Sequence, residues 1–135
     1  MASKLFTLEE AEALLPYLAP ALFQLQRVKR EHDEALQHLT ALSQKTKSNG
    51  HGMDAGLAQA RQTVDRTSTL INSLVEKVQG MGCELKDMDT GLIDFRAERG
   101  GREVYLCWKL GEEHIAHWHE LDTGFAGRQP LETPE

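Results

Sequence analysis

The chain of 135 residues has few cysteines, prolines and aromatic residues, and it lacks any long hydrophobic run. Its two cysteines, Cys83 and Cys107, are too few for a disulfide framework, so we expect free thiols packed as small hydrophobic side chains. No apolar stretch approaches the length of a membrane span, and residues 1–6 lack the apolar core of a signal peptide. These absences predict a cytoplasmic protein that does not enter a membrane.

Positive charge is also scarce, with 15 Lys and Arg residues against 21 Asp and Glu residues and a net charge of −6. This balance argues against a broad basic surface that binds nucleic acid or an anionic membrane. The chain also lacks a phosphate-binding Walker loop, a dinucleotide fingerprint and a Ser/His/Asp nucleophile motif. Its length suits one hydrophobic core, so we expect a single domain over residues 1–135.

Residues 1–82 predict a helical hairpin. Thr7 and Glu10 form a capping box, in which each side chain bonds the amide of the other residue at the start of a helix. Pro16 and Pro20 then remove two amide donors and clash with the preceding turn. We therefore expect a short first helix over residues 8–15, with a kink or a restart between the two prolines.

Two apolar stripes at helical spacing follow, and they predict two long helices. The first of these long helices, whose stripe begins at Leu18, runs to about Gln44, and the second spans Leu57 to Val78. A polar, glycine-rich loop over residues 45–52 joins them and makes them antiparallel neighbours. A lone hairpin leaves much of each stripe exposed to water, so the stripes need the C-terminal third, a second copy of the chain, or both. We favour a homodimer that completes a four-helix arrangement.

Residues 83–135 change to a period of two, which predicts strands. The alternation is clearest over 92–96 and 104–109, with a leading strand at 83–87 and a last one at 114–119. Turns are expected at 98–101 and 110–113. The fold class is therefore α+β: a long antiparallel helical hairpin, with its short kinked first helix, followed by a small antiparallel β-meander.

Pairing across the first turn sets Phe95 opposite Val104 and Ile93 opposite Leu106. The other face then carries polar and small residues, namely Asp94, Arg96, Glu103, Tyr105 and Cys107. The second turn leaves two registers open, because a slip of one residue reverses the faces of a strand.

In the register that we favour, the core receives Ala116 and Trp118, while His117 and His119 join Asp94. In the alternative, Ile115 and both histidines enter the core. Burying Trp118 is more favourable than burying Ile115, and two buried imidazoles are costly.

The favoured register places three candidate metal ligands on one face: Asp94, His117 and His119. Their nitrogen and oxygen atoms suit zinc or another divalent ion. The alternative is that His117 is solvated and His119 only hydrogen-bonds a carboxylate. Two Asp-Thr-Gly triplets, at 89–91 and 122–124, are interpreted as turns.

A second candidate site lies at the end of the chain, where small residues precede Arg128. Such a loop presents amides and a guanidinium to a phosphate or a carboxylate. In the alternative reading, Arg128 pairs with Asp94 or Asp122. The candidate ligand-binding residues are Trp118, His119, Glu120, Asp122 and Arg128.

Several of these segments together resemble one bacterial family, the domain-of-unknown-function 2203 family. They are residues 84–87, 91–95, 101–108, 118–122 and 124–128, with 6–11 near the start. The resemblance covers nearly the whole chain and implies no activity, because the family is uncharacterised. His119, Glu120, Asp122 and Arg128 match the family pattern, whereas His117 replaces a residue that is usually aromatic or aliphatic.

Three functions remain open. The leading hypothesis is a non-enzymatic dimer that binds a ligand, an ion or a partner in its C-terminal third. The second is a metal-dependent hydrolase in which Glu120 or Asp122 acts as general base beside the metal. The third is a coiled-coil scaffold whose sheet is only a cap.

Overall fold

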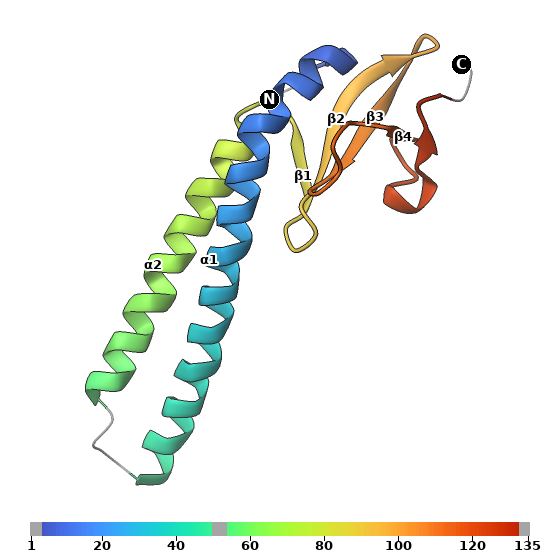
Figure 1. The fold of residues 1–135 in the computed structure, drawn as a ribbon. Helices are drawn as coiled ribbons and strands as arrows, with labels where there is room; N and C mark the ends of the chain where they lie inside the picture. The colour runs from blue at the N-terminus through green and yellow to red at the C-terminus, as the bar shows by residue number, and fades with distance from the viewer. Residues whose placement is uncertain (1–3, 50–53, 133–135) are drawn as a thin grey trace.

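A computed structural model describes residues 4–49 and 54–132, and it confirms the α+β layout. Two helices, α1 (Leu8–Asn49) and α2 (Asp54–Gln79), lie side by side and extend away from the sheet (Figure 1). The strands of the antiparallel sheet follow in chain order: β1 (Glu84–Asp87), β2 (Leu92–Arg99), β3 (Arg102–Lys109), β4 (His117–Glu120) and β5 (Gln129–Pro130). Among the described residues, no helix has a stretch that is long and apolar enough to cross a membrane.

The predicted capping box starts α1. Thr7 Oγ1 accepts the Glu10 amide at 3.1 Å, and Glu10 Oε1 accepts the Thr7 amide at 2.9 Å. The preceding Phe6 is buried and meets Phe95 of β2 edge to face, with 5.3 Å between ring centroids. The Phe6 amide also donates to the Arg96 carbonyl at 2.7 Å. The start of α1 is thus fixed directly on the sheet.

The prediction of a separate short first helix is wrong, because α1 continues through Pro16 and Pro20. Both prolines are exposed, so water can bond the carbonyls that lose their helical partners. Leu15 and Leu18 on the other side are buried in the core, and their packing holds the helix together. Figure 1 shows the first turns of α1 at an angle to the rest of the helix.

The connection between the helices is shorter than predicted. Residues 45–49 belong to α1 rather than to a loop, and α2 begins at Asp54, before Leu57. The remainder of the predicted loop, residues 50–52, lies outside the described residues. A small separate core closes this end of the hairpin and contains Leu42, Leu57 and Ala60.

The β2–β3 register differs by two residues from the predicted one. Phe95 lies opposite Leu106, and Ile93 lies opposite Trp108. The cause is a two-residue turn at Gly100 and Gly101, whose φ values of 59° and 81° suit the tight hairpins that favour glycine. Because the shift is even, every side chain keeps its predicted face.

The favoured β3–β4 register is confirmed, with Trp118 opposite Leu106 and His119 opposite Tyr105. The prediction for the residues before β4 is wrong. Ile115 is buried and Ala116 is exposed. The connection spans residues 110–116 and is longer than the predicted turn, so alternation begins only at His117.

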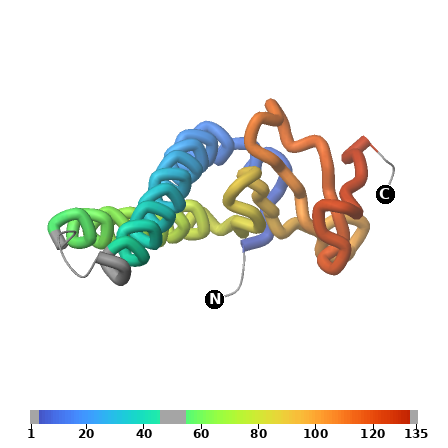
Figure 2. Tube along the Cα trace, turned by 90° about the horizontal axis from the view of Figure 1, so that it is seen from below, coloured from blue at the N-terminus to red at the C-terminus, as the bar shows by residue number. Residues whose placement is uncertain are grey.

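The sheet separates two environments. Its core face packs against α1, the end of α2 and Phe6, and it carries Ile93, Phe95, Ala97, Val104, Leu106, Trp108 and Trp118. The opposite side, here called the polar face, carries Asp94, Arg96, Tyr105, Cys107, His117 and His119. A 3-10 turn, η1 (Phe125–Gly127), and β5 follow β4 and complete this end of the molecule (Figure 2). Sequence periodicity had not indicated either element.

Candidate functional site

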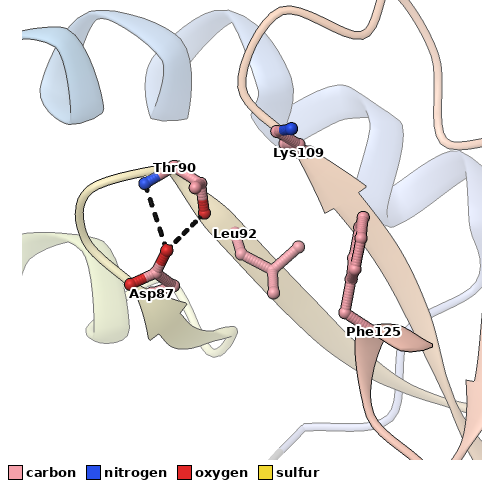
Figure 3. A pocket seen from close by; sticks show the side chains of 5 residues that line it. All are labelled: Asp87, Thr90, Leu92, Lys109 and Phe125. Atoms are coloured by element: carbon pink, nitrogen blue, oxygen red, sulfur yellow. Dashed lines mark hydrogen bonds between the residues drawn. The ribbon is translucent and has the colours of Figure 1, made fainter.

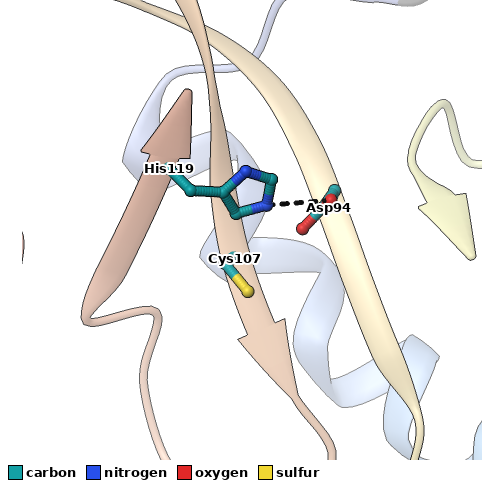
Figure 4. A group of neighbouring side chains, drawn as sticks. All are labelled: Asp94, Cys107 and His119. Atoms are coloured by element: carbon teal, nitrogen blue, oxygen red, sulfur yellow. Dashed lines mark hydrogen bonds and ion pairs between the residues drawn. The ribbon is translucent and has the colours of Figure 1, made fainter. Parts of the chain in front are cut away.

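Three side chains converge on the polar face: Asp94 from β2, Cys107 from β3 and His119 from β4 (Figure 4). Asp94 and Cys107 form a register pair, and His119 reaches across from the next strand. Their candidate ligand atoms lie within 4.8 Å of one another. All three residues are buried, with exposures of 2 %, 0 % and 1 %.

The hydrogen bonds of His119 define which of its nitrogens is available. Nδ1 lies 2.7 Å from the Glu120 carbonyl oxygen, so Nδ1 carries a proton and donates it. Nε2 then faces Asp94 Oδ2 at 3.0 Å. A contact at this distance between a ring nitrogen and a carboxyl oxygen needs one proton between them, and loss of that proton leaves a lone pair on Nε2. A histidine whose other nitrogen donates to a backbone carbonyl is typical of metal ligands.

Asp94 is poorly satisfied for a buried carboxyl. Its Oδ1 has no hydrogen-bond partner among the described residues. Burial raises the pKa of the Asp94 carboxyl above its ordinary value, although His119 beside it acts in the opposite direction. A buried acceptor without a partner is costly, so this oxygen is suited to a cation.

Cys107 lies beside Asp94 and His119 but is not a nucleophile in this arrangement. Burial, together with a smaller effect of the neighbouring Asp94, raises the pKa of its thiol to about 12. The attacking species would be the thiolate, which such a pKa makes scarce near neutral pH. Moreover, His119 Nδ1 bonds a backbone carbonyl and Nε2 faces Asp94, so within the described part of the chain neither imidazole nitrogen is paired with the thiol. Coordination to a metal remains the chemistry in which this thiol can take part.

His117, the third predicted metal ligand, lies outside this cluster. Its Nδ1 accepts a hydrogen bond from Arg128 Nη2 at 2.8 Å. The same Arg128 nitrogen pairs with Glu112 at 3.1 Å, so Glu112 replaces the predicted partners Asp94 and Asp122. The Arg128 guanidinium also covers the Phe125 ring at 4.6 Å. Arg128 therefore fastens the end of the chain to the sheet.

The other predicted ligand-binding residues do not converge. Trp118 is in the core on the opposite face, where the Arg99 guanidinium lies 4.9 Å from its ring. Glu120 pairs with Arg102 at 2.6 Å. Asp122 is exposed in a turn. Both Asp-Thr-Gly triplets form turns, as predicted.

A second group of polar residues lies next to the Asp94–Cys107–His119 cluster. Tyr105 donates to the Glu84 carboxylate at 2.9 Å, and its ring lies 5.3 Å from the His119 ring. Lys86 pairs with Glu84 at 3.0 Å and lies 4.7 Å from the centre of the Tyr105 ring. This second group shields His119 and places a positive charge near the Asp94 carboxyl, which lowers its pKa somewhat against the effect of burial.

A cavity of about 180 Å³ lies on the polar face, next to the Asp94–Cys107–His119 cluster. Leu92 and Lys109, which line it, form the register pair next to the Asp94–Cys107 pair on the same side of the sheet. Phe125 of η1 forms the opposite wall, and Asp87 and Thr90 complete the lining (Figure 3).

Comparison with known proteins gives one match. The model of a family described as "Uncharacterized conserved protein (DUF2203)" matches residues 4–131. No curated protein and no solved structure matches the chain. The resemblance inferred from the short motifs is thereby confirmed, and it adds no activity.

Proposed function

The chain belongs to the DUF2203 family, and since that membership indicates no activity, we propose from the polar face that the protein binds a divalent metal ion, with zinc the best candidate, through Asp94, Cys107 and His119. The observation that carries the proposal is the buried cluster itself, whose three candidate ligand atoms lie within 4.8 Å of one another and whose Asp94 Oδ1 has no hydrogen-bond partner among the described residues.

The charges of the three donors support a divalent ion. A thiolate, a carboxylate and a neutral imidazole sum to two negative charges, which a divalent cation offsets. Burial raises the pKa of both Cys107 and Asp94, so each anion is unfavourable here without a counter-charge. A mixed set of sulfur, nitrogen and oxygen ligands is typical of zinc, whereas magnesium and calcium take oxygen alone.

This chemistry couples binding to protons. The Cys107 thiol, with its pKa at about 12, must lose its proton when it coordinates a metal. Release of one proton strengthens the apparent affinity about tenfold for each unit of rising pH below that pKa. The protein therefore binds zinc more tightly at pH 8 than at pH 6.

Titration of the metal-free protein with Co²⁺ tests the proposal, because a thiolate ligand gives cobalt a charge-transfer band. We expect that band in the wild type and its loss in Cys107→Ser and His119→Gln. Two matched controls, Cys83→Ser and His117→Gln, keep the band, since Cys83 is buried elsewhere and His117 bonds Arg128. A wild type without the band, or a band that survives Cys107→Ser, contradicts the proposal.

A hydrolase built on this metal has less support. Of the two candidate general bases, Glu120 is paired with Arg102 and Asp122 is exposed in a turn. We infer a binding protein of the cytoplasm instead, where a reducing environment keeps Cys83 and Cys107 as thiols.

We also infer a homodimer formed by the helices. The hairpin extends away from the sheet, so much of its surface is covered by no other part of the described chain (Figure 2). Two aromatic side chains of α1 are largely exposed, Tyr17 at 66 % and Phe23 at 60 %. Exposed aromatic residues of this size are typical of protein interfaces.

A further inference from the structure

The cavity beside the triad has apolar walls from two different parts of the chain. Leu92 of β2 lies on one side and the Phe125 ring of η1 stands on the other (Figure 3). Its volume of about 180 Å³ is below that of pockets for drug-sized molecules, which start near ~300 Å³. A compact apolar group fits between these walls.

Lys109 supplies the charge at the edge of this cavity. Its side chain is half-buried, and within residues 4–49 and 54–132 its ammonium makes no hydrogen bond or ion pair. The nearest acid in sequence, Glu112, is occupied by Arg128 and by the Lys109 backbone amide.

The other two polar side chains of the lining, Asp87 and Thr90, are hydrogen-bonded to each other. Thr90 donates to Asp87 Oδ2 from its hydroxyl at 2.6 Å and from its amide at 3.2 Å. Figure 3 shows this pair at the side of the cavity away from Phe125. The cavity therefore offers the positive charge of Lys109 beside apolar walls, and its one negative charge, the Asp87 carboxylate, lies on the side away from Phe125 and is hydrogen-bonded by Thr90.

The geometry points to a binding site for a small organic carboxylate with an aromatic or branched aliphatic body. The carboxylate pairs with the Lys109 ammonium, and the body lies between Leu92 and Phe125. A charge-assisted hydrogen bond at a half-buried amine favours the anion over its neutral amide. The site needs no metal, so its occupation does not depend on the Asp94–Cys107–His119 cluster.

Amide NMR titration with phenylacetate and isovalerate, in the presence of a chelator, tests this site. For a ligand of this size we expect a Kd on the order of 1 mM, with shifts centred on Leu92, Lys109 and Phe125. Phenylacetamide, which has the same body without the charge, should bind about tenfold more weakly.

Two variants separate the roles of charge and wall. Lys109→Met removes the charge and keeps the length, so it should weaken phenylacetate about tenfold and leave phenylacetamide unchanged. Phe125 is exposed, so the fold should tolerate Phe125→Ala, and this variant should weaken the binding of both probes. Lys77→Met, at an exposed lysine of α2, is the control and should change neither. No shifts with either acid, or equal binding by the wild type and Lys109→Met, would overturn the assignment.

Discussion

At the scale of single residues, the two cysteines occupy different kinds of buried position. The Cys83 thiol follows α2 and donates to the Val78 carbonyl at 3.3 Å, within apolar surroundings. Cys107 lies beside a carboxyl and an imidazole. Burial raises the pKa of both thiols, but of the two, within the described residues, Cys107 alone belongs to a cluster that could hold a metal.

The Cys83 thiol predicts a loss of stability in alkali. Burial raises its pKa from 9.0 to about 11 in the folded chain. The unfolded chain loses this proton first, so Cys83 by itself lowers the free energy of unfolding by about 1.4 kcal/mol per pH unit between about pH 9 and about pH 11, and the buried Cys107 adds to this loss. Urea unfolding between these pH values, with a chelator present, measures the slope.

Cys83→Ala is the variant that isolates this effect. It should be less stable near neutral pH, because a buried side chain is shortened, and its slope should be shallower than that of the wild type by the contribution of one thiol. Parallel slopes in the two proteins would refute the assignment of the alkaline loss to Cys83.

The candidate site was only partly predictable at this scale. Alternation along the strands correctly brought Asp94 and His119 to one face. It placed Cys107 there too, but a lone cysteine is more often a packed hydrophobic side chain, so the sequence did not single it out as a candidate ligand. The separation of His117 from this cluster could not be predicted, because its partner, Arg128, comes from a loop whose path no periodicity describes.

At the scale of elements, Gly91 controls the turn between β1 and β2. Its φ of 71° is in the left-handed region, and its carbonyl accepts the Leu110 amide at 3.0 Å. A Cβ at this position would lie 2.6 Å from Leu110 Cβ. The chain therefore needs glycine here for both its backbone angle and its contact.

Gly91→Ala should destabilise the protein by about 2–4 kcal/mol, because left-handed strain and a steric clash add. Gly100→Ala is the control: its φ of 59° is similar, but nothing lies within 4 Å of the added atom. It should cost about 1 kcal/mol, the strain alone. Urea unfolding compares the two, and equal losses would show that the Leu110 contact is unimportant.

Element type and side-chain facing were predictable, whereas exact pairing and continuity were not. The β2–β3 register depended on whether Gly100 and Gly101 alone form the turn, which alternation cannot decide. Continuity of α1 through Pro16 and Pro20 depended on burial of the neighbouring leucines, which is a property of the assembled fold. The strand β5 is only two residues long and carries no periodic signal.

At the scale of the whole molecule, the end of the chain encloses the polar face. The Leu131 amide donates to the Ala116 carbonyl at 2.9 Å, and β5 pairs with β4. Arg128 holds the intervening segment to Glu112 and His117. This return of the chain supplies the Phe125 wall of the cavity.

The proposed homodimer is tested by the mass of the protein in solution. Phe23→Glu places a charge where an exposed ring is available for a partner, so the variant should shift to the mass of a monomer. Thermal unfolding should remain that of a folded protein, because Phe23 is outside the core. Light scattering coupled to size exclusion gives the masses, and a wild type that is monomeric at high concentration contradicts the dimer.

The central claim concerns the buried cluster, and the most direct measurement is the zinc content of protein purified without a histidine tag and equilibrated with buffered Zn²⁺. We predict one zinc per chain in the wild type, in Cys83→Ser and in His117→Gln, and close to none in Cys107→Ser and His119→Gln. The bound metal should also raise the melting temperature of the wild type. A wild type that takes up no zinc, or a Cys107→Ser variant that takes up as much as the wild type, would contradict a metal site at Asp94, Cys107 and His119.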